Sequence, residues 1–300
     1  MKLGTNFGPF GLKPVKEIID EIKELGFDAI DFSLGRDYGV TEENEKEFFT
    51  DIKEYCAQKG LWISQAHAPF GTPNFEPEGF LSEEVFLRSV TAIRRASYVG
   101  APWLVFHPWL RNVHENETYI YNEEERKIAF ETDYKFFKRL EPYFKQYGVN
   151  CAIENLAAID GVTGIHKPSF CSCSKDLKEL LDALNDDIYG VCYDVGHLNL
   201  MPEGSEGIAE FVYNLGDKIK VLHLHDNFGW VTCWGGDLDR HQLPFMGSVP
   251  WKELKQALID VGFNGSFSFE VGKYGPNEEW RKRFAKQIYD SGRLILSDEF

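Results

Sequence analysis

The residues of this sequence best suited to chemistry are imidazoles and carboxylates that end short apolar runs. Six of the eight histidines lie in such runs. Imidazole and carboxylate together form the ligand sets of zinc, manganese and related divalent ions. The runs are QAH, VFH, IEN, YDVGH, HLHDN, DRH and FSFE, and their metal-capable residues are His67, His107, Glu154, Asp194, His197, His223, His225, Asp239, His241 and Glu270. Ligands so far apart in the chain meet only if a fold brings strand ends together.

The elements that must position these residues are short apolar runs, expected to be strands, alternating with longer amphipathic runs, expected to be helices. The expected strands are 3–6, 29–32, 62–67, 103–107, 150–154, 189–193, 219–225 and 266–270. The expected helices are 14–25, 43–59, 82–99, 123–147, 175–184, 208–215, 251–261 and 278–294. Eight βα units predict an α/β fold, a (β/α)8 TIM barrel, built as a single domain from residues 1–300.

A doubly wound open sheet is the main rival to the barrel. Such sheets usually carry a GxGxxG phosphate-binding turn after their first strand. Here that region reads GTNFGPFGLKP, which lacks this spacing. The barrel is therefore favoured.

In a barrel, the carboxyl ends of the strands open into one shared mouth. We therefore expect Glu154, Asp194, His225 and Glu270 to hold one divalent ion, and sequence does not choose among Mn, Zn, Mg and Co. His223 and His225 lie two apart on one expected strand and so face the same side. We favour His225 as the ligand because it is nearer the strand end.

The remaining imidazoles and Asp239 are candidate ligands of further ions. A second ion sharing Glu154 would use His67 and His107. A third would use His197, Asp239 and His241.

Each residue alone also has an ordinary structural interpretation. A histidine at a strand end is more often hydrogen-bonded than metal-bound, Glu154 alone suits a salt bridge, and Asp239 with Arg240 suits a solvated loop. The joint pattern favours metal binding, since burying so many carboxylates without a cation is costly.

Composition argues against some partners. The net charge is −16, and a surface this acidic opposes non-specific binding of nucleic acid, whose phosphates bind Lys and Arg, although acidic enzymes that act on DNA do exist. No stretch approaches the roughly 20 apolar residues of a membrane span, and the first residues lack the apolar run of a signal peptide. The six cysteines form no CxxC pair. We expect reduced thiols and a cytoplasmic protein.

The motifs HAPF, VFHP, IEN, GVCYDVGH, HLHDN, DRH and the final FE resemble those of the xylose isomerase-like TIM barrel superfamily. That superfamily includes sugar phosphate isomerases and epimerases, and AP endonucleases that use three zinc ions. In the isomerase branch the resemblance implies one catalytic ion, held by the four residues named above. Glu154 and Glu270 would shuttle a proton, and His197 would orient substrate hydroxyls.

In the endonuclease branch the resemblance implies additional zinc ligands, which are His67, His107, His197, Asp239 and His241. The sequence shows no basic, DNA-inserting loops after the early strands. The segment after the second expected strand, SLGRDYGVTEENEKE, has Arg36 before an acidic run, and GTPNFEPEG after the third is acidic too.

The leading hypothesis is a metal-dependent isomerase or epimerase of a sugar or sugar phosphate. It would work by Glu-mediated proton transfer through a metal-stabilised enediolate. His67, His107, His197, Arg240 and Lys273 are the expected substrate contacts. The resemblance also implies a homodimer or homotetramer. The alternatives are a three-zinc AP endonuclease-type phosphodiesterase and a non-catalytic sugar-binding barrel.

Overall fold

The structure is a computed structural model that describes residues 1–300 apart from 71–75, 230–238 and 273–276. Eight parallel strands form one sheet in the order β10-β1-β2-β3-β4-β5-β8-β9. They are β1 Lys2–Thr5, β2 Ala29–Ser33, β3 Trp62–His67, β4 Trp103–Phe106, β5 Asn150–Glu154, β8 Tyr189–Asp194, β9 Ile219–His223 and β10 Ser266–Phe269. Each lies within two residues of a predicted strand.

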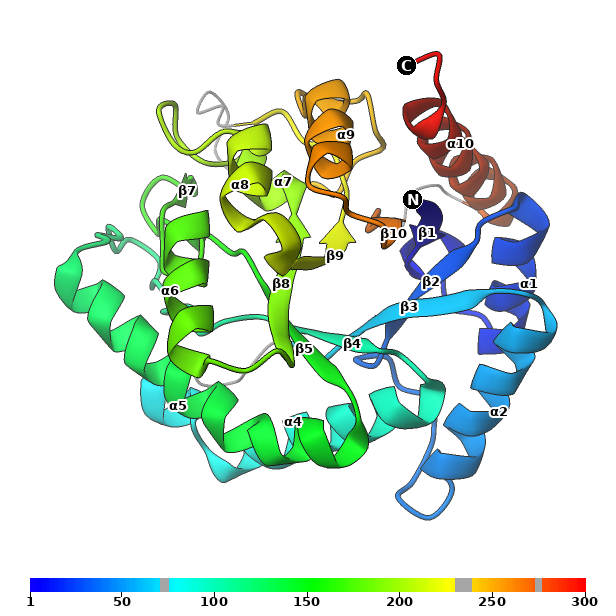
Figure 1. The fold of residues 1–300 in the computed structure, drawn as a ribbon, viewed down its shortest axis with the longest axis horizontal. Coiled ribbons are helices and arrows are strands. Elements are labelled where there is room, and N and C mark those ends of the chain that lie inside the picture. Colours follow the sequence, from blue (N-terminus) through cyan, green and yellow to red (C-terminus); the bar gives the residue numbers. More distant parts are fainter. Residues whose placement is uncertain (71–75, 230–238, 273–276) are drawn as a thin grey trace.

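The sheet closes between β9 and β10 through a single residue. Leu224, directly after β9, forms an isolated bridge with Phe269. Its N–H donates to the Ser268 carbonyl at 3.0 Å, and its own carbonyl accepts from Glu270 N–H at 3.0 Å. Helices surround the closed sheet (Figure 1). The predicted TIM barrel is thus confirmed.

The eight predicted helices are also present, with ends within two residues of those expected. They are α1 Val15–Leu25, α2 Glu45–Gln58, α4 Glu83–Val99, α5 Glu123–Tyr147, α6 Ser174–Leu184, α8 Ile208–Leu215, α9 Trp251–Asp260 and α10 Glu278–Leu296. Shorter elements, which the sequence patterns did not predict, lie in the loops. They are two 3-10 turns at Gly8–Phe10 and Gly216–Lys218, the helices α3 Pro77–Phe80 and α7 Val195–Asn199, and a hairpin of β6 Ala158–Ile159 with β7 His166–Lys167.

Local chemistry explains where these helices begin and end. In α4 the Ser82 side chain accepts a hydrogen bond from Val85 N–H, as an N-cap does. The helix ends at Gly100, whose φ of 82° is open to glycine at little cost. Helix α1 buries Ile18, Ile19 and Ile22, a spacing that directs one apolar stripe onto the sheet. The position at which each helix ends, together with its apolar stripe, determines where the following strand joins the barrel.

Because all eight strands are parallel, their carboxyl ends share one rim of the barrel. The loops that follow β3, β5, β8 and β9 rise from this rim. In the described part of the chain, no helix combines the length and the apolar character needed to cross a membrane.

Candidate metal centre

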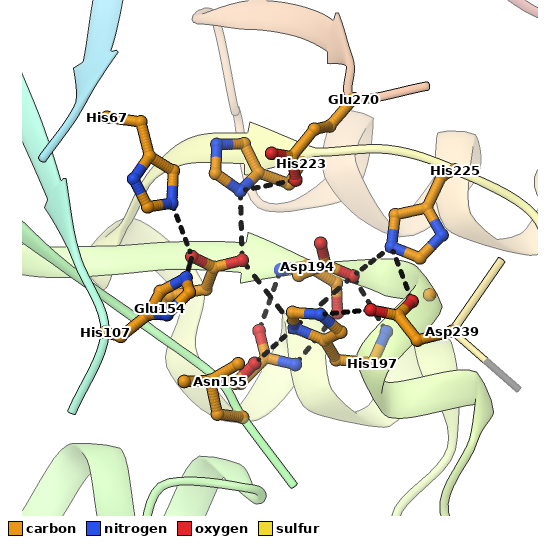
Figure 2. Close-up of polar contacts among 12 residues, drawn as sticks. His67, His107, Glu154, Asn155, Asp194, His197, His223, His225, Asp239 and Glu270 are labelled. Carbon is orange, nitrogen blue, oxygen red and sulfur yellow. Dashed lines mark hydrogen bonds and ion pairs between the residues drawn. The ribbon is translucent and has the colours of Figure 1, made fainter. Parts of the chain in front are cut away.

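Four strand ends converge on one point of the rim (Figure 2). Ligand atoms of Glu154, Asp194, His223 and Glu270, from β5, β8, β9 and the residue after β10, all lie within 4.8 Å of one another. We call these four residues the central cluster. His223 Nδ1 is 3.0 Å from Glu154 Oε1 and 3.2 Å from Glu270 Oε2. Three carboxylates and one imidazole thus point at a common centre, a geometry that suits a divalent ion.

Electrostatics keeps the buried acids of this cluster charged. Glu154 is 1% exposed and Asp194 is fully buried. Burial raises the pKa of Glu154, but the charges of His223 and His107 outweigh it and hold that pKa well below its usual value. Burial likewise raises the pKa of Asp194, and the charges of His197 and His225 lower it overall. Among the described residues, neither Glu154 Oε2 nor Asp194 Oδ2 has a hydrogen-bond donor of good geometry, although His107 Nε2 lies 3.1 Å from Glu154 Oε2. Orphaned buried oxygens of this kind fit ligands of a cation.

The imidazole whose ligand atom lies with those of Glu154, Asp194 and Glu270 belongs to His223, whereas the sequence led us to expect His225 there. Strand β9 ends at His223, and Leu224, the next residue, pairs with Phe269. The His225 ring lies instead beside His241, with ring centroids 3.9 Å apart.

A second group of ligand atoms within 4.8 Å of one another comes from His197, His225, Asp239 and His241, which we call the rim cluster. Asp239 Oδ2 lies 3.3 Å from His197 Nε2 and 3.1 Å from His241 Nε2. Burial raises the pKa of Asp239, but the His197 charge and its hydrogen bond lower it overall. Burial lowers the pKa of His241, yet Asp239 and Glu270 raise it to about 10. The rim cluster is thus a tight network of charged groups.

A third group joins His67, Glu154 and His223. His67 Nε2 is 3.4 Å and His107 Nε2 is 3.1 Å from Glu154 Oε2. The Nδ1 of His67 contacts the Ala68 carbonyl at 2.7 Å, so it carries the proton and leaves Nε2 facing Glu154. The structure therefore places His67 and His107 around Glu154, where the sequence pattern expected them to share it.

Asp31, which sequence reasoning missed, lies beneath the central cluster. Its Oδ2 is 3.0 Å from His223 Nε2, the ring nitrogen that faces away from Glu154 and Glu270. Gln65 Nε2 donates to the same Oδ2 at 3.1 Å and to the Leu222 carbonyl at 3.1 Å. The one signal in the sequence was an acid inside the apolar strand AIDFS.

Asn155 and Asp226 fix the backbone of loops at the barrel mouth. Sequence reasoning did not identify either residue. Asn155 Oδ1 accepts the Asp194 N–H at 2.7 Å, and its Nδ2 donates to the Asp194 carbonyl at 2.8 Å. The Asp226 carboxylate accepts hydrogen bonds from the N–H groups of Phe245 and Val249 and from Trp251 Nε1. Asp226 thereby fixes the end of the loop that carries Asp239 and His241.

A cavity of 610 Å³ opens beside the central cluster. Its walls include Asp31, His67 and Glu270 from the barrel, and Arg36 and Phe70 from the loops. A small polar molecule in this cavity would meet Glu270 directly. Of the two cations expected to contact substrate, Arg240 is exposed beside Asp239 and His241, and Lys273 lies outside the described residues.

Comparisons with known proteins agree with this architecture. The chain is 22% identical to D-psicose 3-epimerase of Enterocloster bolteae over 263 residues, covering 85% of this chain and 76% of that one. It is 25% identical to a probable endonuclease 4 of Metamycoplasma arthritidis over 228 residues, covering 73% and 74%. Among solved structures it superposes on the IOLI protein with a binding zinc atom at a TM-score of 0.75, with 18% identity and coverage of 100% and 99%.

The family model of the xylose isomerase-like TIM barrel matches residues 19–288. That span contains every strand except β1 and every residue of the three ligand groups. The chain therefore belongs to the xylose isomerase-like TIM barrel family.

Proposed function

We propose that this protein is a metal-dependent isomerase or epimerase of a sugar or sugar phosphate. The observation that carries the proposal is the placement of Glu154 and Glu270. Both carboxylates lie about 3 Å from one ring nitrogen of His223, and they come from β5 and from the end of β10. Two carboxylates that flank one ion position provide a base and an acid for moving a proton at a carbon.

The position of each residue indicates its proposed role in the reaction. An ion bound in the central cluster would polarise the substrate carbonyl and so acidify the neighbouring C–H group. Glu270 borders the 610 Å³ cavity and would take or return the proton from that side. Glu154 is held ionised by His223 and His107 and would serve the opposite side. His197, His67 and His107 would orient hydroxyl groups or hold further ions.

The family relationship supports the same class of reaction. Relatives named D-psicose 3-epimerase and fructoselysine 3-epimerase align with this chain, the second over 32% of it. Both names describe epimerases of sugars or sugar conjugates. Zinc is one candidate for the ion, since the structurally similar IOLI protein binds it, and the oxygen-rich central cluster also suits manganese, magnesium or cobalt.

The test is proton exchange at the reacting carbon. Purified protein with Mn²⁺ or Zn²⁺ is incubated with D-psicose, D-fructose and their phosphates in deuterated water, and NMR follows deuterium incorporation and epimer formation. Glu154→Gln and Glu270→Gln should each lower the rate by roughly 10²–10⁴-fold, the usual worth of a general acid or base. His114→Asn, which removes an exposed imidazole, is the matched control. Full activity in either Gln variant would end the two-Glu proposal.

A phosphodiesterase acting at abasic sites is a second candidate, because the described residues bring candidate ligand atoms together in three groups and endonuclease 4 relatives align. The charge of −16 opposes it, since DNA phosphates favour basic surfaces. Incubation with a duplex containing one abasic site separates the two: strand cleavage that Glu154→Gln abolishes would favour the nuclease. The expected homodimer or homotetramer remains a prediction for sedimentation analysis.

A further inference from the structure

We propose that a cavity at the amino end of the barrel binds a small polyol that carries one phosphate or carboxylate group. The cavity has a volume of 450 Å³, within the range of small-molecule sites. Its described walls include Trp62, Gln65, Trp103, Lys220 and Ser266. Trp62, Trp103 and Ser266 are the first residues of β3, β4 and β10, whereas the central cluster gathers at the carboxyl ends of strands. The proposal therefore concerns a second site, separate from that of the sugar reaction.

Two glycines make room for this cavity. The interior of a (β/α)8 barrel is usually filled by bulky branched side chains. Here a Cβ added at Gly4 of β1 would lie 2.2 Å from Ser266 Oγ. One added at Gly190 of β8 would lie 2.3 Å from Lys220 Cγ and 3.2 Å from Trp103 Cζ3. The two glycines therefore allow polar and aromatic walls to approach the backbone, as at strand positions beside a ligand.

The Gln65 side chain offers the cavity a hydrogen-bond acceptor. It is fully buried, and its Nε2 donates to Asp31 Oδ2 and to the Leu222 carbonyl, at 3.1 Å each. Because a carbonyl only accepts, the amide must turn its NH₂ group toward these partners and its Oε1 away from them. Among the described residues, neither Gln65 Oε1 nor Ser266 Oγ, which is also buried, has a hydrogen-bond partner. Buried oxygens without partners are costly, so both atoms favour a ligand that offers hydroxyl groups.

Lys220 supplies the positive charge of the lining. The pairing of β8 with β9 shifts register at Lys220, and a bulge of this kind re-aims a side chain. Lys220 Nζ lies 5.9 Å from the centroid of the Trp103 ring, and no carboxylate in the described part of the chain lies within ion-pair distance of it. Asp217, the one acid of the described lining, is exposed to solvent. The Lys220 ammonium is thus available to a phosphate or carboxylate group.

The rings of Trp62 and Trp103 give the cavity its apolar surface. Each ring belongs to the first residue of its strand, and Trp62 is 36% exposed although it is a large aromatic residue. The C–H groups of a polyol gain by leaving water against such rings. A carbon skeleton that bears hydroxyl groups and one anionic group therefore fits the lining better than an inorganic anion does.

The competing interpretation is a cavity filled by water alone. Buried waters commonly satisfy polar atoms such as Gln65 Oε1 and Ser266 Oγ. In that case Lys220 would be an ordinary lysine at the end of the barrel, and removing its charge would change no affinity. The two interpretations therefore differ in the expected effects of Lys220→Gln and Ser266→Ala.

Calorimetric titration of four proteins separates the two interpretations. Sorbitol 6-phosphate, gluconate, inorganic phosphate and uncharged sorbitol are titrated into wild type, Lys220→Gln, Ser266→Ala and the control Lys46→Gln, which removes an exposed charge from α2. We expect an anionic polyol to bind wild type and the control equally, and the tighter of the two polyols identifies the anionic group. Lys220→Gln should weaken that binding by roughly tenfold, the worth of a charged hydrogen bond, and sorbitol and inorganic phosphate should bind at least that much more weakly.

Ser266→Ala gives a readout that a structural role would not give. It should weaken binding by roughly threefold, and it should leave the Tm unchanged or raised because it removes a buried hydroxyl without a partner. A lower Tm together with unchanged affinity would show a structural hydroxyl and contradict the proposal.

A crystal soaked with the tighter polyol locates the site, since an anion can also meet an ion at the barrel mouth. Density beside Trp103 that reaches Lys220 would support the proposal. Water alone in this cavity, no binding of either anionic polyol, or equal affinity in wild type and Lys220→Gln would overturn it. No readout involves turnover, so failure of the proposed reaction and failure of this site are told apart.

Discussion

The central cluster and the rim cluster sit on the same barrel mouth but are built from opposite ligand sets. The central cluster has three carboxylates and one imidazole, and it borders a 610 Å³ cavity through Glu270. The rim cluster has three imidazoles and one carboxylate, and two of its rings are tied to backbone carbonyls. The two clusters therefore differ in the divalent ions that their ligand sets favour.

The largest expected effect is that of Glu154→Gln. Glu154 belongs to the central cluster and also contacts His67 and His107. The variant should lose the central ion and roughly 10²–10⁴-fold of the turnover, and it should keep the ion that we expect the rim cluster to hold, called here the rim zinc. Ion counting together with the deuterium-exchange assay checks this. Loss of every ion from a folded Gln variant would show that the clusters are not separate.

Metal exchange is expected to distinguish the central cluster from the rim cluster by the metal that each prefers. Protein stripped by a chelator and returned to Mn²⁺ should take up manganese at the central cluster, because hard oxygen ligands suit Mn²⁺ better than three imidazoles do. Manganese EPR should then give the same Mn²⁺ count in wild type and in Asp239→Asn. A lower count in Asp239→Asn would place manganese in the rim cluster and break the distinction.

Asp31→Asn should have an intermediate effect that is confined to the central cluster. A carboxylate that accepts the outer N–H of a metal-bound histidine typically contributes 10–100-fold to metal affinity. We expect that loss for the central ion, turnover regained at high metal concentration, and an unchanged KM for sugar. Chelator titration and steady-state kinetics measure the two. A raised KM with unchanged metal affinity would instead make Asp31 a substrate contact.

The smallest expected effect is that of Trp251→Phe. This change removes the hydrogen bond from Trp251 Nε1 to Asp226 and leaves a buried acceptor with one donor fewer. It should cost about 1 kcal/mol of unfolding free energy. Because Asp226 holds the loop after Asp239 and His241, the rim zinc should loosen slightly and the central ion should not change. Denaturant unfolding and zinc competition report on both, and a weaker central ion would argue that the loop serves both clusters.

Much of the fold could be predicted because periodicity is a local property. The apolar stripe of Ile18, Ile19 and Ile22, and the glycine that ends each of α1, α4 and α5, are visible in the sequence alone. Parallel strands then bring their ends to one rim whatever the side chains are. The gathering of Glu154, Asp194 and Glu270 follows from that topology.

The choice between His223 and His225 could not be made locally. Both residues sit at even spacing, and proximity to the strand end favoured His225. Which ring joins Glu154, Asp194 and Glu270 depends on how the chain runs after β9, where Leu224 pairs with Phe269 across the closing seam. Asp31 was missed for a similar reason, because its partner His223 is distant in sequence. Contacts that form only when the barrel closes cannot be recognised in the sequence of a single strand or helix.

The most direct test of the account is a crystal structure of zinc-loaded protein with anomalous data at the zinc edge. The account predicts one peak bounded by Glu154, Asp194, Glu270 and the Nδ1 of His223, and a separate peak beside Asp239, His197 and His241. A single ion reached by His225 together with Glu154 and Glu270, or a rim without zinc, would contradict it.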